Sequence, residues 1–333
     1  MQKTNDKLYV YASTRIRAAE GNGTEKERLD RLLEAKSTSA VASLIIDSGL
    51  VPAGVDTGEG VSSLLNRALD HAVHLVLDAV PEPEMYSFLL YKYDCNNLKV
   101  CIKAHFKGSG ADGLYFTCGT VPPENAEEAV RNRNFTAFPP HMAAAAAEAI
   151  DSYEQTGESR SIDFILDRAC FADVSDAAAA TGVPFFGEYT SAVADTTNLL
   201  TSARIADSGA DPAAAEALLN RVYLPGGQVK LSTLLSPDGG AAPFSALAER
   251  MDPSPLKNIT AEITSFEDAD RLYGEYLNSL TASFAFKAFG PEIPACFLIE
   301  REKEITRFRK AAALISAGVV GKDKLRERMG ALL

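Results

Sequence analysis

Apolar side chains recur at spacings of three and four residues along most of this chain, which is the pattern of helices that bury one face. The pattern predicts helices over residues 25–50, 64–80, 143–150, 213–221, 262–284 and 297–317. Pro81 ends the second of these, and Asp211 with Pro212 forms a typical start for the fourth. Only residues 8–11 and 114–117 alternate weakly in the manner of strands. The expected fold class is therefore all-α, with at most a minor β element.

Three ten-residue segments of the chain resemble one another. Each begins with a charged residue, has Asn or Glu at the fourth position and Leu or Ile at the fifth, and ends with a basic residue. The first, fourth and tenth positions are Asp94, Asn97 and Lys103 in the first segment, Asp195, Asn198 and Arg204 in the second, and Arg301, Glu304 and Lys310 in the third. The fourth positions are 101 and 106 residues apart, close to one third of the 333-residue chain. The interval predicts one helical unit used three times, with subdomains over residues 1–118, 119–225 and 226–333.

The helical geometry of these segments gives each position a direction. At 100° per residue, the fifth and eighth positions form one stripe that is predicted to face the core. Asn97 and Asn198 flank this stripe, so they need hydrogen-bond partners if they are covered. The basic tenth position lies on the opposite side, where Lys103, Arg204 and Lys310 are expected to tie subdomains together or to line an interface. Two simpler interpretations stay open: an amphipathic helix that recurs by chance, and basic residues that only form a solvated helix face.

The charge of the chain limits its partners. It has 33 Lys and Arg against 45 Asp and Glu, a formal net charge of −12. This excess disfavours nucleic acid as a partner and disfavours purely electrostatic binding to an anionic membrane leaflet. The five cysteines form no Cys-x-x-Cys pair, which is typical of free thiols in a reducing cytoplasm. No apolar run approaches the roughly 18 to 20 residues that cross a bilayer, so we expect a cytoplasmic protein without direct lipid insertion.

Motifs for nucleotide or metal binding are incomplete. Residues 318–323 contain two glycines and a lysine but end in Asp, where a phosphate-binding loop needs Ser or Thr. The glycine-rich residues 107–113 follow a predicted helix and are expected to form a surface loop. Cys101 and His105 share a helix face but supply only two of the ligands that zinc requires. We therefore expect neither a bound cofactor nor a metal.

One pair of carboxylates keeps an enzymatic alternative open. Asp163 and Asp167 have the spacing of an aspartate-rich magnesium motif, as in an all-α enzyme of the isoprenoid type, although a solvated helix edge has the same pattern. No Gly-x-Ser-x-Gly nucleophile motif is present. A generic helical scaffold is a further alternative, but its repeat of about 100 residues would be far longer than the roughly 34 to 47 of helical solenoids. The absence of catalytic motifs favours a mechanical or binding role.

Several segments resemble a known family in the same order along the chain. Residues 8–17, residues 93–104 and residues 300–309, followed by Leu-Arg-Glu-Arg at 325–328, are similar to the C subunit of bacterial and archaeal V/A-type ATPases. The eukaryotic relative of that subunit is the d subunit of the vacuolar proton pump. The most specific signature is Asp-x-x-Asn-Leu-Lys at 94–99, with Ile-Lys at 102–103. Residues 113–159 and 239–257 carry little of the resemblance.

The resemblance implies a fold and a function. Members of this family are all-helical and funnel-shaped, with three pseudo-symmetric subdomains around a central cavity, in agreement with the threefold recurrence. They are non-catalytic rotor parts of the central stalk, located at the membrane through the ATPase complex. They link the central shaft to the proteolipid ring and transmit the torque that couples ATP hydrolysis or synthesis to H⁺ or Na⁺ transport. In the third segment, Arg301 and Glu304 replace Asp and Asn, so equivalent packing is not implied there.

Overall fold

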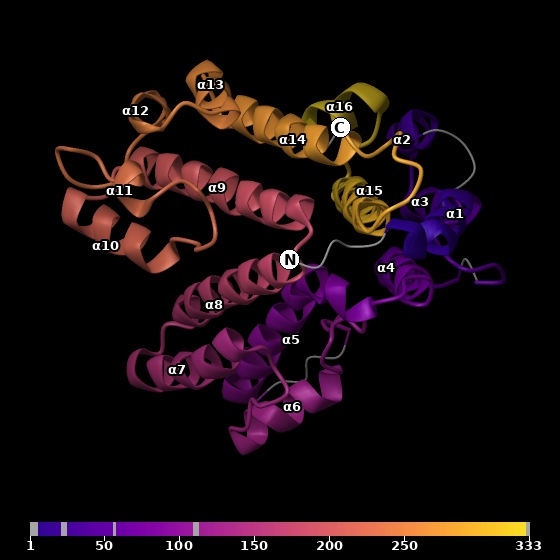
Figure 1. The fold of residues 1–333 in the computed structure, drawn as a ribbon, viewed down its shortest axis with the longest axis horizontal. Coiled ribbons are helices and arrows are strands. Elements are labelled where there is room, and N and C mark those ends of the chain that lie inside the picture. Colours follow the sequence, from indigo (N-terminus) through magenta and orange to yellow (C-terminus); the bar gives the residue numbers. More distant parts are fainter. Residues whose placement is uncertain (1–5, 21–24, 56–57, 109–112, 331–333) are drawn as a thin grey trace. The chain divides into compact units, whose positions relative to one another are not determined.

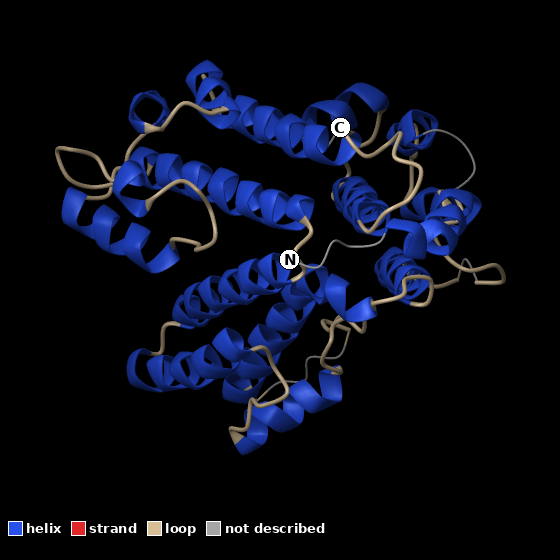
Figure 2. Cartoon of the chain, viewed as in Figure 1, coloured by secondary structure: helices blue, strands red, loops and turns tan. Residues whose placement is uncertain are grey.

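The chain folds almost entirely into helices. A computed structural model describes residues 6–20, 25–55, 58–108 and 113–330 (Figure 1). Within these ranges there are sixteen α-helices and two short 3-10 helices, and the only β feature is an isolated bridge between Leu235 and Ala241 (Figure 2). The all-α fold class is confirmed.

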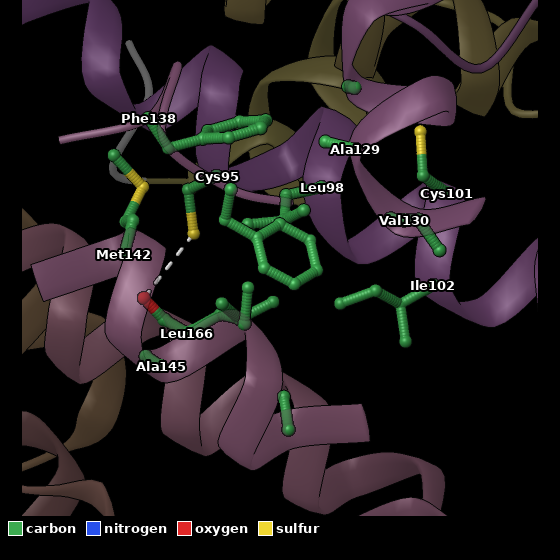
Figure 3. Packing of buried hydrophobic residues seen from close by; sticks show 14 of the residues in the cluster. Cys95, Leu98, Cys101, Ile102, Ala129, Val130, Phe138, Met142, Ala145 and Leu166 are labelled. Atoms are coloured by element: carbon green, nitrogen blue, oxygen red, sulfur yellow. Dashed lines mark hydrogen bonds between the residues drawn. The ribbon is translucent and has the colours of Figure 1, made fainter. Parts of the chain in front are cut away.

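The first of two compact units spans residues 85–280 and contains two apolar cores. α5 to α8 enclose one core, which Figure 3 shows around Leu98, Phe138 and Leu166. α9 to α14 enclose the other, which includes Leu199 and Leu219. The helices are α5 (Ser87–Lys107), α6 (Pro123–Asn132), α7 (Pro140–Thr156), α8 (Ser159–Ala180), α9 (Pro184–Asp207), α10 (Pro212–Val222), α11 (Leu231–Leu234), α12 (Phe244–Arg250), α13 (Pro255–Glu262) and α14 (Phe266–Ala282), preceded by the 3-10 helix η2 (Pro83–Tyr86).

The second unit joins residues 6–84 to residues 281–330, so segments far apart in the sequence share one fold. Its central helix α15 contacts α1, α2, α3, α4 and α16. The apolar stripe of α15, including Ile305 and Phe308, is buried with Leu64 and Leu65 of α4. The elements are the 3-10 helix η1 (Asp6–Tyr9), α1 (Val10–Ala19), α2 (Glu25–Leu33), α3 (Thr38–Asp47), α4 (Val61–Leu77), α15 (Glu292–Ser316) and α16 (Lys322–Met329).

The helix predictions hold, with shifts of a few residues at several ends and one helix that is divided in two. The stretch 25–50 is two helices, because Ser37 caps α3 by accepting a hydrogen bond from the backbone N–H of Ala40 at 3.1 Å. The predicted cap at Asp211 is confirmed, since its carboxylate accepts from the N–H of Ala214 at 3.1 Å. The apolar spacing located helices, and a local side-chain hydrogen bond decided where one of them breaks.

Both strand predictions are wrong. Residues 8–11 belong to η1 and α1, where Ala12, Ser13 and Ile16 are buried at helical spacing. Residues 114–117 are irregular, and the backbone of Phe116 pairs with the side chain of Asn97 instead of a neighbouring strand. An apolar run of four residues is too short to distinguish a strand from the end of a helix or from a loop that is fixed by side-chain hydrogen bonds.

The two compact units divide the chain after residues 84 and 280, whereas the predicted subdomains divide it after residues 118 and 225. The three-subdomain division stays a prediction. Residues 109–112 of the predicted glycine-rich loop lie outside the described residues. Across the described part of the chain, no helix has both the length and the apolar composition of a membrane span.

Candidate functional site

The motif of the first segment holds a loop. Asp94 and Asn97 lie on α5 and are fully buried. Asp94 Oδ1 accepts from the N–H of Val121 at 2.9 Å, and its Oδ2 accepts from the hydroxyl of Thr120 at 2.6 Å. The Asn97 side-chain amide pairs with both backbone groups of Phe116, at 2.7 and 2.9 Å. Two polar side chains of the helix thus satisfy the backbone of the loop that follows it.

The motif of the second segment makes similar contacts, with a backbone N–H in place of the hydroxyl that donates to Asp94. Asp195, on α9, accepts from the N–H of Gln228 at 2.9 Å and from that of Val229 at 2.7 Å. The Asn198 amide donates to the carbonyl of Leu224 at 2.8 Å and accepts from its N–H at 2.9 Å. The residues that sequence reasoning expected to need partners therefore have them. The first motif holds the irregular segment that follows its own helix α5, and the second holds the irregular segment that follows α10, the next helix after α9.

The two held loops share a pattern that the sequence analysis missed. The residue paired with Asn is followed three positions later by glycine, and two positions after that by a valine whose N–H reaches the Asp. The loop positions are Phe116, Gly119 and Val121 in the first and Leu224, Gly227 and Val229 in the second. A Cβ on either glycine would collide with Oδ1 of the motif Asp. This Gly-x-Val signal is visible in the sequence, but only a search of the loops as well as the helices finds it.

The third segment holds its surroundings by charge. Glu304 on α15 is buried between two arginines: Arg28 Nε of α2 lies 2.5 Å from its Oε1, and Arg301 Nη1 lies 2.8 Å from its Oε2. Arg301 also donates to the carbonyl of Ala19 at 3.3 Å and lies over the ring of Phe297. The segment held here comes from the other end of the sequence, before α15 in the chain and not after it.

The stripe positions are buried as predicted. Leu98, Leu199 and Ile305 at the fifth position expose at most 3% of their surface. The eighth positions are buried in the same way, namely Cys101, Ser202 and Phe308. The periodicity therefore gave the correct inner face for all three helices.

The basic tenth positions reach neighbouring helices of the same chain. Lys103 Nζ lies 2.5 Å from a carboxylate oxygen of Asp163 on α8. Arg204 lies 3.6 Å from Asp270 on α14, and both side chains are about half exposed. Lys310 donates to a backbone carbonyl in the last turn of α16 at 3.0 Å. Each residue thus ties its long helix to another helix, and a role at an interface with a partner stays a prediction.

The aspartate pair on α8 does not form a metal site. Asp163 pairs with Lys103, and Asp167 pairs with Lys99, so a lysine of α5 opposes each carboxylate. In the described ranges, no three His, Cys, Asp or Glu side chains are grouped so that they could hold a metal. Cys101 interacts with the hydroxyl of Tyr115 at 3.7 Å, and burial raises the pKa of its thiol to about 11. This arrangement does not support the isoprenoid-type alternative.

Comparison with known proteins decides the family. The sequence model of the ATP synthase (C/AC39) subunit family matches residues 12–328, which is nearly the whole chain. The chain belongs to this family. The matched region includes α5, α9 and α15 with all three motif segments.

Three relatives are similar over most of their length. The C subunit of the V-type sodium ATPase of Enterococcus hirae is 24% identical over 94% of this chain and 95% of the relative. The C subunit of the A-type ATP synthase of Thermococcus onnurineus is 23% identical, covering 97% and 90%. That of Methanocaldococcus jannaschii is 25% identical, covering 90% and 81%. Each of these alignments therefore covers most of both chains.

Because Asp94 and Asp195 are buried, we expect the stability of the chain to have an unusual pH dependence. Burial raises the pKa of both Asp94 and Asp195 above its usual value, although the backbone and hydroxyl donors partly oppose the shift. A raised folded-state pKa means that the folded chain binds the proton more tightly than the unfolded chain. The stability contributed by this group therefore increases as the pH falls through the folded pKa towards the unfolded one.

Asparagine cannot take up this proton. Relative to Asp94→Asn or Asp195→Asn, we expect the wild type to gain in free energy of unfolding between pH 7 and about pH 4.5. Urea titrations at the two pH values measure the difference, with Gly187→Ala as a control that adds and removes no titrating group. A wild-type advantage that shrinks on acidification would contradict the assignment.

Proposed function

We propose that this chain is the non-catalytic central-stalk rotor subunit of a V/A-type ATPase or ATP synthase. It links the central shaft to the membrane proteolipid ring and transmits the torque that couples ATP hydrolysis or synthesis to H⁺ or Na⁺ transport. The observation that carries the proposal is the family match over residues 12–328. The relatives, named as C subunits of a V-type sodium ATPase and of A-type ATP synthases, support it.

The internal contacts suit a part that must transmit force. A body under torque must resist deformation, and it does so when its loops and helices are fixed by buried, fully paired polar groups. Asp94 and Asn97 fix one loop, Asp195 and Asn198 fix another, and the Glu304 cluster fixes α2 to α15. Among the described residues, no buried side-chain nitrogen or oxygen lacks a hydrogen-bond partner. Stiffness of this kind supports a mechanical role.

We infer that the three motifs mark three related units arranged as a funnel with a central cavity. In the first, the long helix α5 holds the loop that follows it, and in the second, α9 holds the loop that follows α10. In the third, Ala19 and Arg28, which precede α15 in the chain, supply the contacts. The amino-terminal segment would thereby complete the third unit. The predicted third subdomain, residues 226–333, does not include this segment.

Docking at the membrane should depend on protein contacts. A body of net charge −12 is repelled by an anionic leaflet within a Debye length of about 8 Å. We propose that the shaft and the loops of the proteolipid ring supply the attachment, so that the chain lies at the cytoplasmic side of the membrane through the complex.

Vesicle sedimentation tests this attachment. We expect the isolated chain to sediment with vesicles that contain the purified proteolipid ring and to remain in the supernatant with phosphatidylserine vesicles that lack it. Vesicles with an unrelated membrane protein are the control. Equal binding to the vesicles with the ring and to the phosphatidylserine vesicles without it would overturn the proposed attachment. Binding to neither would exclude the ring as a direct partner.

A further inference from the structure

α5 and α8 pack antiparallel with a regular register. Lys103 faces Asp163, and one turn earlier on α5, Lys99 faces Asp167 one turn later on α8. Each step of four residues along one helix is matched by a step of four along the other. The next step of four residues on each helix brings Cys95 to the level of Phe171, and Cys170 precedes Phe171 by one residue on α8.

The contacts of Cys95 agree with this register. Its thiol donates to the carbonyl of Leu166 at 3.5 Å, and that carbonyl lies one helical turn before Cys170 (Figure 3). The same sulfur is 4.0 Å from a carboxylate oxygen of Asp167. A hydrogen bond with the thiol of Cys95, together with burial, raises the pKa of Cys170. Both cysteines are free and buried.

The helix geometry permits a bond between them. Packed helices have axes about 8 to 10 Å apart, and their Cα atoms lie about 2.3 Å from each axis. Facing Cα atoms can therefore approach to about 3.5 to 5.5 Å, which overlaps the range of about 4.4 to 6.8 Å found for disulfides. The other helix-bound thiol of this core, Cys101, interacts with Tyr115 and not with a second sulfur.

We propose that Cys95 and Cys170 form a redox-sensitive site that closes into a disulfide joining α5 to α8. The oxidant is a low-molecular-weight disulfide such as oxidised glutathione. One protein thiol, as the thiolate, attacks this disulfide and forms a mixed disulfide with release of one small thiol. The second protein thiolate then displaces the other small thiol. Two protein thiols are oxidised by two electrons, one small disulfide is reduced, and the two protons leave with the released thiols.

The link should stabilise the unit. It would close a loop between residues 75 positions apart in the sequence, and a long closed loop reduces the entropy of the unfolded chain. We expect the melting temperature to increase by about 5 °C. Because both thiols are buried and the pKa of Cys170 is raised, the reaction should be slow. The inference depends only on α5 and α8 and not on the proposed function.

The test uses the full chain incubated with oxidised glutathione, followed by digestion without reductant and mass spectrometry. We expect a peptide that links Cys95 to Cys170, a higher melting temperature, and reversal of both by dithiothreitol. Cys101→Ser should retain the linked peptide, whereas Cys95→Ser and Cys170→Ser should lose it. The wild-type measurement does not depend on the folding of any variant.

Three results would overturn the proposal. The first is that both thiols stay reduced after prolonged incubation. The second is that the linked peptides join other cysteines in place of this pair. The third is that the Cys95–Cys170 link forms but lowers the melting temperature, since the folded helices would then not accommodate the bond.

Discussion

Replacing Glu304 with glutamine should lower the free energy of unfolding by about 3 kcal/mol. The carboxylate lies between Arg28 and Arg301, and all three side chains expose 12% or less of their surface. The substitution keeps the size of the side chain but leaves two buried guanidinium groups without the charge that they both contact. Burial already lowers the pKa of Arg301, and the Glu304 charge opposes that shift. Urea unfolding measures the loss, and amide hydrogen exchange should increase in α2.

A matched control separates burial from charge pairing in general. Glu275 forms an ion pair with Arg271 on the surface of α14, where both side chains are half exposed or more. Glu275→Gln should leave the unfolding transition almost unchanged, because exposed ion pairs contribute little. Equal effects of the two substitutions would contradict the view that the Glu304 cluster anchors α2 to α15.

Replacing Gly227 with alanine should cost about 2 kcal/mol or more. The added methyl group would meet Oδ1 of Asp195, which also accepts the N–H of Val229 at 2.7 Å. Either the loop or the carboxylate must move, and a buried hydrogen bond weakens with that movement. Gly119→Ala should behave in the same way, because its Cβ would meet Oδ1 of Asp94. Thermal and urea unfolding measure both variants.

For Gly187, we expect the same substitution to have the opposite effect on stability. It lies inside α9, and a Cβ there would meet no other atom within 4 Å. Gly187→Ala should therefore stabilise the chain by about 0.5 to 1 kcal/mol through helix propensity. If Gly227→Ala were as harmless as Gly187→Ala, the close approach of the loop to Asp195 would not exist in solution.

Much of the fold follows from periodicity alone. The inner faces of α5, α9 and α15 are those predicted from the fifth and eighth positions of the three segments, because helix geometry fixes which positions lie together. Periodicity alone could not show that the predicted helix over 25–50 is divided in two. Its interruption depends on the hydroxyl of Ser37, and a serine within an apolar pattern fits both a cap and an exposed helix position.

The long-range contacts could not be predicted from the helices. Sequence reasoning identified Asp94, Asn97, Asp195 and Asn198 but not the loops that they hold, because those loops lie 19 to 34 positions away with different spacings. The partner of Glu304 on α2 lies much further away in the sequence. Arg28 is 276 positions away in the sequence, and only the folding of the amino-terminal segment against α15 brings the two together.

The most direct test of the rotor role is ATP-driven ion transport by the rotary complex reconstituted in vesicles with and without this chain. We expect the complex without the chain to hydrolyse ATP without moving H⁺ or Na⁺, and addition of the chain to restore transport in proportion to its binding. Gly187→Ala, which leaves the motifs intact, should restore transport like the wild type. Full ATP-driven transport in a complex that lacks the chain would contradict the proposed role.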